Sequence, residues 1–322
     1  MGRMAFVFPG QGSQGVGMGK ALAAAFPVAA AVFAAADAAL GEPVAALAFD
    51  GPADDLDRNE NAQPALLATS IAYLRALEAA LAAAGRPALE PAFYAGHSMG
   101  QYSALVAAGV ISLADGVRLV RERGVRMQAS GGDGAMAAVI GLDDKRLSEL
   151  LEAGRRHGVC GLANRNSPGQ VVLSGDRAAV EAAAEAARGL GARRAVVLPV
   201  SVAAHSPLMA EAARGMRGVL AGVAFAEPTA PLLANADARP LTTGEACRAE
   251  LVEHLTTGVD WVAAVQAMAA AGVTTFLEVG PGRVLTGLIG RIVPDLDVLA
   301  LDDPASPGRL AIPDLDAAPA SA

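Results

Sequence analysis

The sequence predicts an α/β protein in which a small domain is inserted into a larger one. Strand-like and helix-like segments alternate on both sides of residues 132–202, and this inner stretch has a βαββαβ order of its own. The length of 322 residues suits about two domains at roughly 150 residues each. We therefore expect a discontinuous large domain from residues 1–131 and 203–322, and an insert from residues 132–202.

The first part of the large domain is expected to contain two strands and four helices. A glycine-rich turn, Pro9-Gly10-Gln11-Gly12, follows the first strand, and Pro64 suits the first turn of a helix. Ser112 and Asp115 have the pattern of a capping box. The expected elements are strands at 4–8 and 93–95 and helices at 18–36, 63–84, 102–110 and 113–130.

The insert and the sequence after it continue the alternation. Asn166-Ser167-Pro168-Gly169 predicts a turn between two strands of the insert. The expected insert elements, in the ferredoxin-like order, are strands at 135–140, 161–164, 170–174 and 194–200 and helices at 143–153 and 177–190. The later elements are strands at 231–235 and 275–279 and helices at 245–255 and 260–271. The tail from Asp302, with Pro304, Pro307, Pro313 and Pro319, is expected to be extended over the surface or disordered.

Composition excludes several classes of protein. Apolar residues make up 53% and charged residues 18%, which excludes a disordered chain. The net charge of −8 argues against binding to nucleic acid or to an anionic membrane. Cys160 and Cys247 lack disulfide or zinc spacing and fit a reducing compartment. The N-terminal apolar run is too short for a signal peptide, and no stretch of roughly 18 strongly apolar residues is expected, so the sequence favours a cytoplasmic protein.

Gly96-His97-Ser98-Met99-Gly100 carries the strongest chemical signal. It is a G-x-S-x-G motif, in which a serine nucleophile sits on a tight strand-to-helix turn. The amide of Met99 and the helix N-terminus would stabilise an oxyanion. Such short patterns also arise by chance in a chain with 36 glycines. The apolar strand before the motif and the helical pattern after it favour the catalytic interpretation of Ser98.

A serine nucleophile needs a base, and the chain has four histidines. His97 adjoins the serine and is expected to point away from it. His157 lies in a charged stretch and is expected to be solvated, and His254 lies on a predicted helix, where a structural role is the default. His205 follows the last strand of the insert, in a loop between the domains where a cleft is expected. It is the best candidate base, although no acidic third member is evident between Ser98 and His205.

Six blocks, in order from about residue 4 to 300, resemble the malonyl-CoA:acyl-carrier-protein transacylases of type II fatty-acid synthases and free-standing polyketide acyltransferases. The resemblance implies an α/β-hydrolase-like large domain with a ferredoxin-like insert. The blocks are Phe8-Pro9-Gly10-Gln11-Gly12-Ser13-Gln14, Gly96-His97-Ser98-Met99-Gly100-Gln101-Tyr102-Ser103-Ala104-Leu105, Arg123-Gly124, Asn166-Ser167-Pro168-Gly169-Gln170, the His205 segment and Glu278-Val279-Gly280-Pro281-Gly282.

The resemblance also implies roles for the site residues. Ser98 would attack the thioester with His205 as general base, and the backbone carbonyl of His254 would orient that base. Gln11 and the amide of Met99 would form the oxyanion hole. The side chains expected to bind substrate are Arg123, which would hold the free carboxylate, and Gln63 and Asn166, which would line the site. From the residues alone, Arg123 equally fits a solvated helix residue, and Asn166 fits turn chemistry.

The expected reaction is a ping-pong transfer of a malonyl group from malonyl-CoA to the phosphopantetheine thiol of an acyl carrier protein. No bound cofactor or metal and a monomeric protein are expected. A serine acyl hydrolase or thioesterase on the same scaffold, and a carrier-binding module without activity, are the alternatives. Ala203-Ala204 before His205 fits neither the malonyl nor the methylmalonyl pattern of related polyketide domains, so a branched extender unit stays open. Gln101 stands where the family more commonly has Glu, and His254 where it often has Gln.

Overall fold

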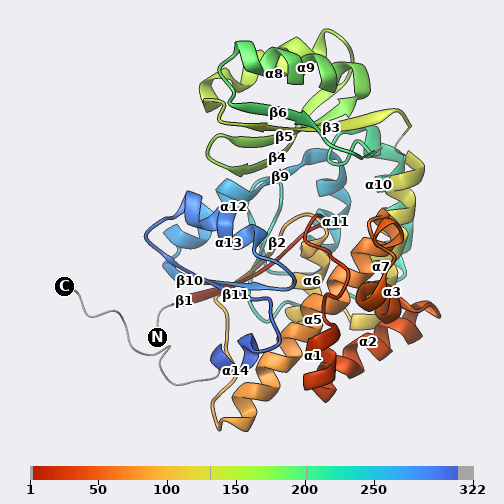
Figure 1. Cartoon of the computed structure of the whole chain (residues 1–322), viewed down its shortest axis with the longest axis vertical. Coiled ribbons are helices and arrows are strands. Elements are labelled where there is room, and N and C mark those ends of the chain that lie inside the picture. Colours follow the sequence, from red (N-terminus) through yellow and green to blue (C-terminus); the bar gives the residue numbers. More distant parts are fainter. Residues whose placement is uncertain (1–2, 131, 201, 311–322) are drawn as a thin grey trace.

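The computed structural model describes residues 3–130, 132–200 and 202–310, which form an α/β fold with two mixed sheets (Figure 1). The main sheet has the order β11-β10-β1-β2-β7-β8, and its strands run parallel except for the β7–β8 pair. Its strands are β1 Arg3–Phe8, β2 Phe93–Gly96, β7 Leu232–Leu233, β8 Pro240–Leu241, β10 Val273–Val279 and β11 Asp297–Leu301.

Strand β1 shows why this sheet is buried on both faces. Ala5 and Val7 belong to an apolar cluster with α12 (Trp261–Ala270) and α13 (Val284–Ile292). Phe6 and Phe8 belong to a cluster on the other face. Successive side chains of a strand point to opposite faces, so a continuous apolar run is what a strand covered on both sides requires.

The helices on the Phe6 side form the larger layer of the core. They are α1 Lys20–Ala25, α2 Pro27–Leu40, α3 Val44–Asp50, α4 Ala53–Leu56, α5 Asn59–Ala83, α6 Gly100–Ala107, α7 Leu113–Ser130, α10 Ala210–Ala221, α11 Gly244–Thr257 and α14 Ser306–Leu310. Most of them pack on the long helix α5, whereas α10 packs on α7 and α11 packs on α10.

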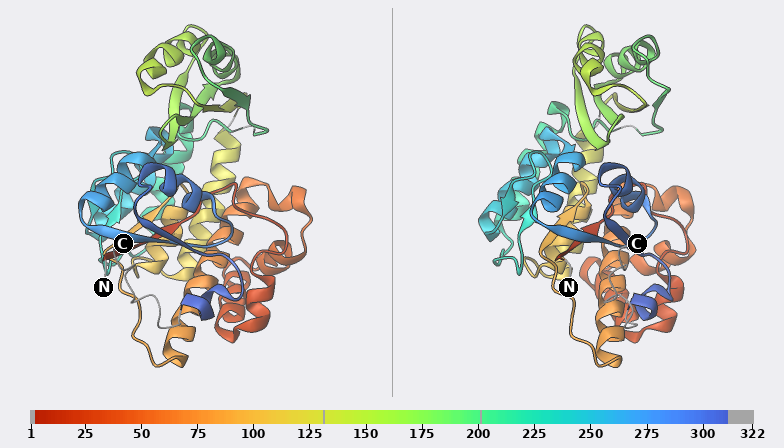
Figure 2. Two further views of the ribbon diagram at one scale, coloured as in Figure 1. Left: turned by 60° about the vertical axis from the view of Figure 1, so that its left-hand side comes forward. Right: turned by 90° about the vertical axis from the view of Figure 1, so that its left-hand side faces the viewer.

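The second sheet is built by the βαββαβ segment and extended by a strand from outside it. Its order is β6-β3-β5-β4-β9, antiparallel except for the β4–β9 pair. Figure 2 shows this sheet and its two helices standing above the main sheet. Its elements are β3 Gly134–Ile140, η1 Asp144–Arg146, α8 Leu147–Arg155, β4 Cys160–Ser167, β5 Gln170–Asp176, α9 Arg177–Gly189, β6 Arg194–Val197 and β9 Val259–Asp260. The short helix η2 Pro207–Met209 lies between β6 and α10 in the chain.

Most expected elements are confirmed, and proline accounts for two differences. The helix expected over 18–36 is two helices, because Pro27 lacks an N–H and begins α2 after the extended residue Phe26. Helix α5, expected over 63–84, begins at Asn59, one turn earlier, so Pro64 lies inside it and not in its first turn. The N-cap at Ser112 is confirmed, since its Oγ accepts the Asp115 N–H at 3.0 Å; the Asp115 carboxylate accepts the Ser112 hydroxyl at 2.6 Å.

The C-terminal segment also differs from the expectation. Residues 302–310 are not an extended tail: α14 packs against α5, and Ser306 and Pro307 are buried. The Tyr73 hydroxyl donates to the main-chain oxygen of Asp302 at 2.8 Å, which ties this segment to α5. Pro313 and Pro319 lie outside the described residues. Helices α3, α4, α10 and α13 and strand β11 were not anticipated from the sequence.

Helix α5 corrects the expectation that no stretch is apolar enough to span a membrane. Its 25 residues pass that test by length and composition. However, 72% of its most apolar window is buried within the protein, as in a central core helix. The other helices that pack around α5 therefore explain its apolar character.

The turn between β2 and α6 depends on two glycines. A Cβ on Gly96 would collide with the backbone of Gly100, and a Cβ on Gly100 would collide with the carbonyl oxygen of Phe8. The His97 N–H donates to that same oxygen at 3.0 Å. The turn is therefore packed directly against β1, and only residues without a side chain fit at these two positions.

Gly100→Ala should lower the free energy of unfolding by at least about 2 kcal/mol, because backbone must move to admit the Cβ. Gly218→Ala is the matched control: Gly218 is exposed on α10 with open space around it, so alanine should stabilise by about 0.5–1 kcal/mol. Urea unfolding of both variants measures the difference. Equal effects of the two substitutions would contradict the packing described.

Candidate active site

Ser98 lies at the turn between β2 and α6 with φ 53°, a left-handed conformation that non-glycine residues rarely adopt. Its Oγ is 2.8 Å from Nε2 of His205. Its N–H donates to Oδ1 of Asn235 at 2.8 Å. Both the side chain and the backbone of the serine are thus held in place, and the hydroxyl faces a base.

His205 lies between β6 and η2 and is 5% exposed. Its Nδ1–H donates to the backbone carbonyl of His254 at 2.6 Å, so Nε2 is free to accept the Ser98 hydroxyl proton. Burial lowers its pKa well below the usual value, with further lowering by the charges of His254 and Arg123. The imidazole is therefore neutral at pH 7, as a general base must be.

Arg123 on α7 is 1% exposed, which excludes the interpretation as a solvated helix residue. Its Nη2 donates to Ser98 Oγ at 2.9 Å and its Nη1 to Gln63 Oε1 at 2.8 Å. Within the described residues no carboxylate pairs with it, and its Nε has no hydrogen-bond partner. A buried guanidinium without an anion is costly, and it is well suited to receive a ligand carboxylate.

Of the other expected site residues, Asn166 and the Gln11 side chain do not contact Ser98, whereas the Met99 amide directly follows it. Asn166 on β4 contacts His97, whose Nε2 is 2.9 Å from Asn166 Oδ1, rather than Ser98. The Gln11 side chain is exposed, and its Nε2 donates to Asn59 Oδ1 at 2.7 Å rather than to the serine. In the described part of the chain the Met99 amide has no protein acceptor, which leaves it available to an oxyanion.

Three buried polar residues support the site through hydrogen bonds that the sequence did not predict. Gln101 bridges two strands: its Oε1 accepts the Gly96 N–H at 3.1 Å, and its Nε2 donates to the Leu233 carbonyl at 3.0 Å. Asn235 lies two residues after the end of β7, which neighbours β2. Polar residues after adjacent parallel strands meet at one sheet edge, and this signal would have found Asn235.

The third is Glu250, one helical turn before His254. Its Oε2 accepts from His254 Nδ1 at 3.3 Å, and its Oε1 accepts the Asn235 N–H at 2.8 Å. The i,i+4 spacing of Glu250 and His254 on a helix is a signal visible in the sequence.

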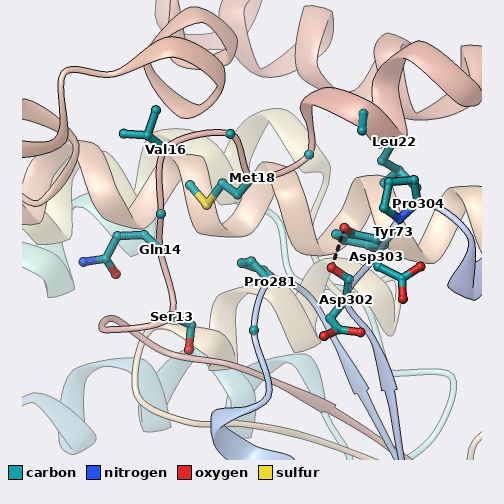
Figure 3. A pocket seen from close by; sticks show the side chains of 15 residues that line it. Ser13, Gln14, Val16, Met18, Leu22, Tyr73, Pro281, Asp302, Asp303 and Pro304 are labelled. Atoms are coloured by element: carbon teal, nitrogen blue, oxygen red, sulfur yellow. Dashed lines mark hydrogen bonds between the residues drawn. The ribbon is translucent and has the colours of Figure 1, made fainter.

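A separate hollow of about 360 Å³ lies beside the loop that follows β1 (Figure 3). Tyr73 points toward Asp302 there, and burial raises the pKa of its phenol. Asp302 pairs with Arg283 at 2.7 Å and Asp303 pairs with Arg309. None of the residues around Ser98 lines this hollow. Among the described residues, no three His, Cys, Asp or Glu side chains gather as a metal site would require.

Comparison with known proteins agrees with this geometry. The acyl transferase domain family matches residues 5–296. The malonyl CoA-acyl carrier protein transacylase of Escherichia coli K12 is 47% identical over 308 residues, 95% of this chain and 98% of the relative. An acyl-carrier-protein-S-malonyltransferase from Bartonella henselae superposes with a TM-score of 0.91 at 44% identity, covering 98% of this chain and 100% of that one.

A third comparison includes a bound partner. A malonyl-transacylase solved in complex with its type II polyketide acyl-carrier protein superposes with a TM-score of 0.90 at 43% identity, covering 95% and 97% of the two chains. These matches cover nearly the whole chain, and their identities lie well above those at which only a fold is shared. The chain belongs to the acyl transferase domain family, among its malonyl CoA-acyl carrier protein transacylases.

Proposed function

We propose that this chain transfers a malonyl group from malonyl-CoA, through an ester on Ser98, to the phosphopantetheine thiol of an acyl carrier protein. The observation that carries the proposal is that Ser98 Oγ faces a neutral base and a buried arginine at once, at 2.8 and 2.9 Å. The base activates the nucleophile, and the arginine provides a site for the malonyl carboxylate.

In the first half-reaction Ser98 Oγ attacks the thioester carbonyl carbon, and its proton passes to Nε2 of His205. The imidazolium is stabilised by the His254 carbonyl, which keeps the Nδ1 proton. As the tetrahedral intermediate collapses, the carbon–sulfur bond breaks and the coenzyme A sulfur takes the proton from His205. The backbone N–H groups of Met99 and Gln11 stabilise the oxyanion, since the Gln11 side chain is bonded to Asn59 instead.

The second half-reaction reverses these roles. The carrier thiol gives its proton to His205 as its sulfur attacks the Ser98 ester, and Ser98 Oγ leaves with that proton. Arg123 holds the carboxylate through both steps, so the acyl carbon stays beside Ser98. A serine hydrolase acting on neutral acyl groups would leave this guanidinium buried and unpaired, which argues against that alternative.

The domain organisation is part of the proposal. A parallel sheet that ends in a nucleophile turn supports an α/β-hydrolase-like large domain from residues 1–131 and 203–322. The strand order β6-β3-β5-β4 supports a ferredoxin-like insert at 132–202. We also propose a cytoplasmic monomer that acts without a bound cofactor or metal. Ala203 is fully buried and Ala204 partly so beside the base, and a branched extender unit is the alternative substrate.

We propose that the carrier protein docks at a hollow of about 460 Å³ between the second sheet and α13. Three arginines line it: Arg193, Arg283 and Arg291. Arg291 Nη1 donates to Gln170 Oε1 at 2.7 Å, which joins the two walls. The whole chain carries a charge of −8, so an anionic partner needs such a local concentration of cations. Arg194, a neighbour in the sequence, does not line this hollow.

Arg123→Ala tests the function most sharply. It should lower the rate of malonyl loading from malonyl-CoA by at least about 100-fold, because a buried charge pair with the substrate is lost. Loading from acetyl-CoA should stay unchanged or improve. Arg118→Ala, an exposed residue of the same helix, is the control. Intact-mass kinetics measure both donors, and equal losses on malonyl and acetyl would contradict the role of Arg123.

The pH dependence follows from the neutral base. Loading requires unprotonated His205, so its rate should rise with pH through the pKa of His205 and be flat above it. Because that pKa is lowered, the midpoint should lie below 6.5. His254→Gln keeps the backbone acceptor and removes the imidazole whose electrostatic interaction lowers the pKa of His205, so the midpoint should move upward. A wild-type midpoint at or above 6.5, or a downward move, would contradict this.

Arg291→Glu should raise the KM for the holo carrier protein by about tenfold, with a reduced dependence on salt. Loading from malonyl-N-acetylcysteamine, which carries no phosphate, should be unaffected. Arg217→Glu, an exposed arginine outside the hollow, is the control for added negative charge. An unchanged KM for the carrier in Arg291→Glu would show that docking occurs elsewhere.

A further inference from the structure

A buried carboxylate behind the reacting pair has no part in the chemistry described above. Glu250 on α11 is 1% exposed, and within the described residues no Lys or Arg forms an ion pair with it. A carboxylate without compensating hydrogen bonds is costly to bury. Its two oxygens therefore depend on the two donors that they accept from, the Asn235 N–H and His254 Nδ1–H.

Each of these two donors belongs to a residue that holds one of the reacting groups. The Asn235 side chain accepts the Ser98 N–H at 2.8 Å. The His254 carbonyl accepts the His205 Nδ1–H at 2.6 Å. With the 2.8 Å contact between Ser98 Oγ and His205 Nε2, five residues form a closed ring of hydrogen bonds. Glu250 closes this ring on the side away from the reaction.

The ring joins two strained positions of the backbone. Ser98 has φ 53° and His205 has φ 61°, and both are non-glycine residues in the left-handed region. Such conformations persist only where the surrounding structure over-determines them. The His254 Nε2 is buried without a partner in the described part of the chain, so the bond to Glu250 is what orients its side chain.

We infer that Glu250 is a positioning residue for the reacting pair, holding Asn235 and His254 so that Ser98 and His205 meet at bonding distance. The inference rests on the proposed function only in taking Ser98 as the nucleophile. The essential property of Glu250 is the length of its side chain, because one carboxylate must accept from two separate donors. Glu250 also carries charge, which acts to raise the pKa of Arg123 against the lowering by burial. Substitutions at Glu250 can change the length of this side chain and its charge separately.

Glu250→Gln keeps the length and loses the charge, whereas Glu250→Asp keeps the charge and is one methylene too short to span both donors. The probe is diisopropyl fluorophosphate, which phosphorylates Ser98 Oγ with loss of fluoride and transfer of the proton to His205. Its reaction needs the Ser98–His205 pair but no acyl donor. Glu253→Gln is the matched control, because Glu253 lies on the same helix, is exposed, and pairs with Arg239.

Glu250→Gln should react within about fivefold of the wild type, because its oxygen still accepts from Asn235 and its amide can pair with the other tautomer of His254. Glu250→Asp should react about 30-fold or more slowly, since a displacement of about 1 Å can cost up to about 100-fold. The His205 Nδ1 proton, observed by NMR, should persist in Glu250→Gln and broaden in Glu250→Asp. Glu253→Gln should leave both readouts unchanged.

Glu250→Asp reacting as fast as Glu250→Gln, equal losses in the two, or wild-type rates in both would overturn the inference. If Glu250→Asp is unfolded by circular dichroism, Glu250→Gln decides alone: a loss beyond about 20-fold, or loss of the His205 proton, overturns it. A wild-type protein that reacts with the fluorophosphate but accepts no malonyl group would contradict the proposed function and leave this inference standing.

Discussion

The 2.8 Å contact between Ser98 Oγ and His205 Nε2 is the constraint on which the rest of the structure depends. Both residues hold a positive φ, a conformation that costs about 1–3 kcal/mol at each position. The main sheet stabilises the strained turn after β2, because β2 lies between β1 and β7 and the turn is held on both sides. Gly100 fits against β1, and Gln101 joins the end of β2 to Leu233 of β7.

Burial then sets the electrostatics of the site. The same helical layer that covers the sheet excludes water from Arg123 and His205, which are 1% and 5% exposed. Burial keeps the base neutral, and it makes an unpaired guanidinium expensive. In the proposed function a malonyl carboxylate would pair with this guanidinium, so selectivity for a charged acyl group and activation of the serine would both follow from burial of the site. The carrier protein has to reach this site from outside, which gives the arginine-lined hollow beside α13 its proposed role.

The sequence predicted those parts of the fold that depend on local patterns. The alternation around Ser98, the βαββαβ order and the helix N-cap at Ser112 are local, and the structure confirms them. The division of the expected helix at Pro27 was missed because a long apolar pattern continues through the proline. The packing of residues 302–310 on α5 was missed because proline content predicts local conformation and not tertiary contacts.

The residues of the candidate site likewise fall into those that the sequence predicted and those that it did not. The G-x-S-x-G motif predicted Ser98 as the nucleophile, and the resemblance to a family predicted roles for His205, Arg123 and the His254 carbonyl; the structure brings these four residues together. Asn235 and Glu250 were missed, because their importance lies in contacts between segments far apart in the chain. Gln101 looked like a lost charge, yet its amide both accepts and donates, which an ionised carboxylate cannot do.

The most direct test of the central claim is the intact mass of the protein after brief exposure to malonyl-CoA without a carrier. The account predicts that the wild type gains the mass of one malonyl group, that peptide mapping locates it on Ser98, and that Ser98→Ala gains nothing. It further predicts that adding holo carrier protein removes the adduct and transfers it to the carrier thiol. A wild-type mass that never changes, or an adduct that persists in Ser98→Ala, would contradict the account.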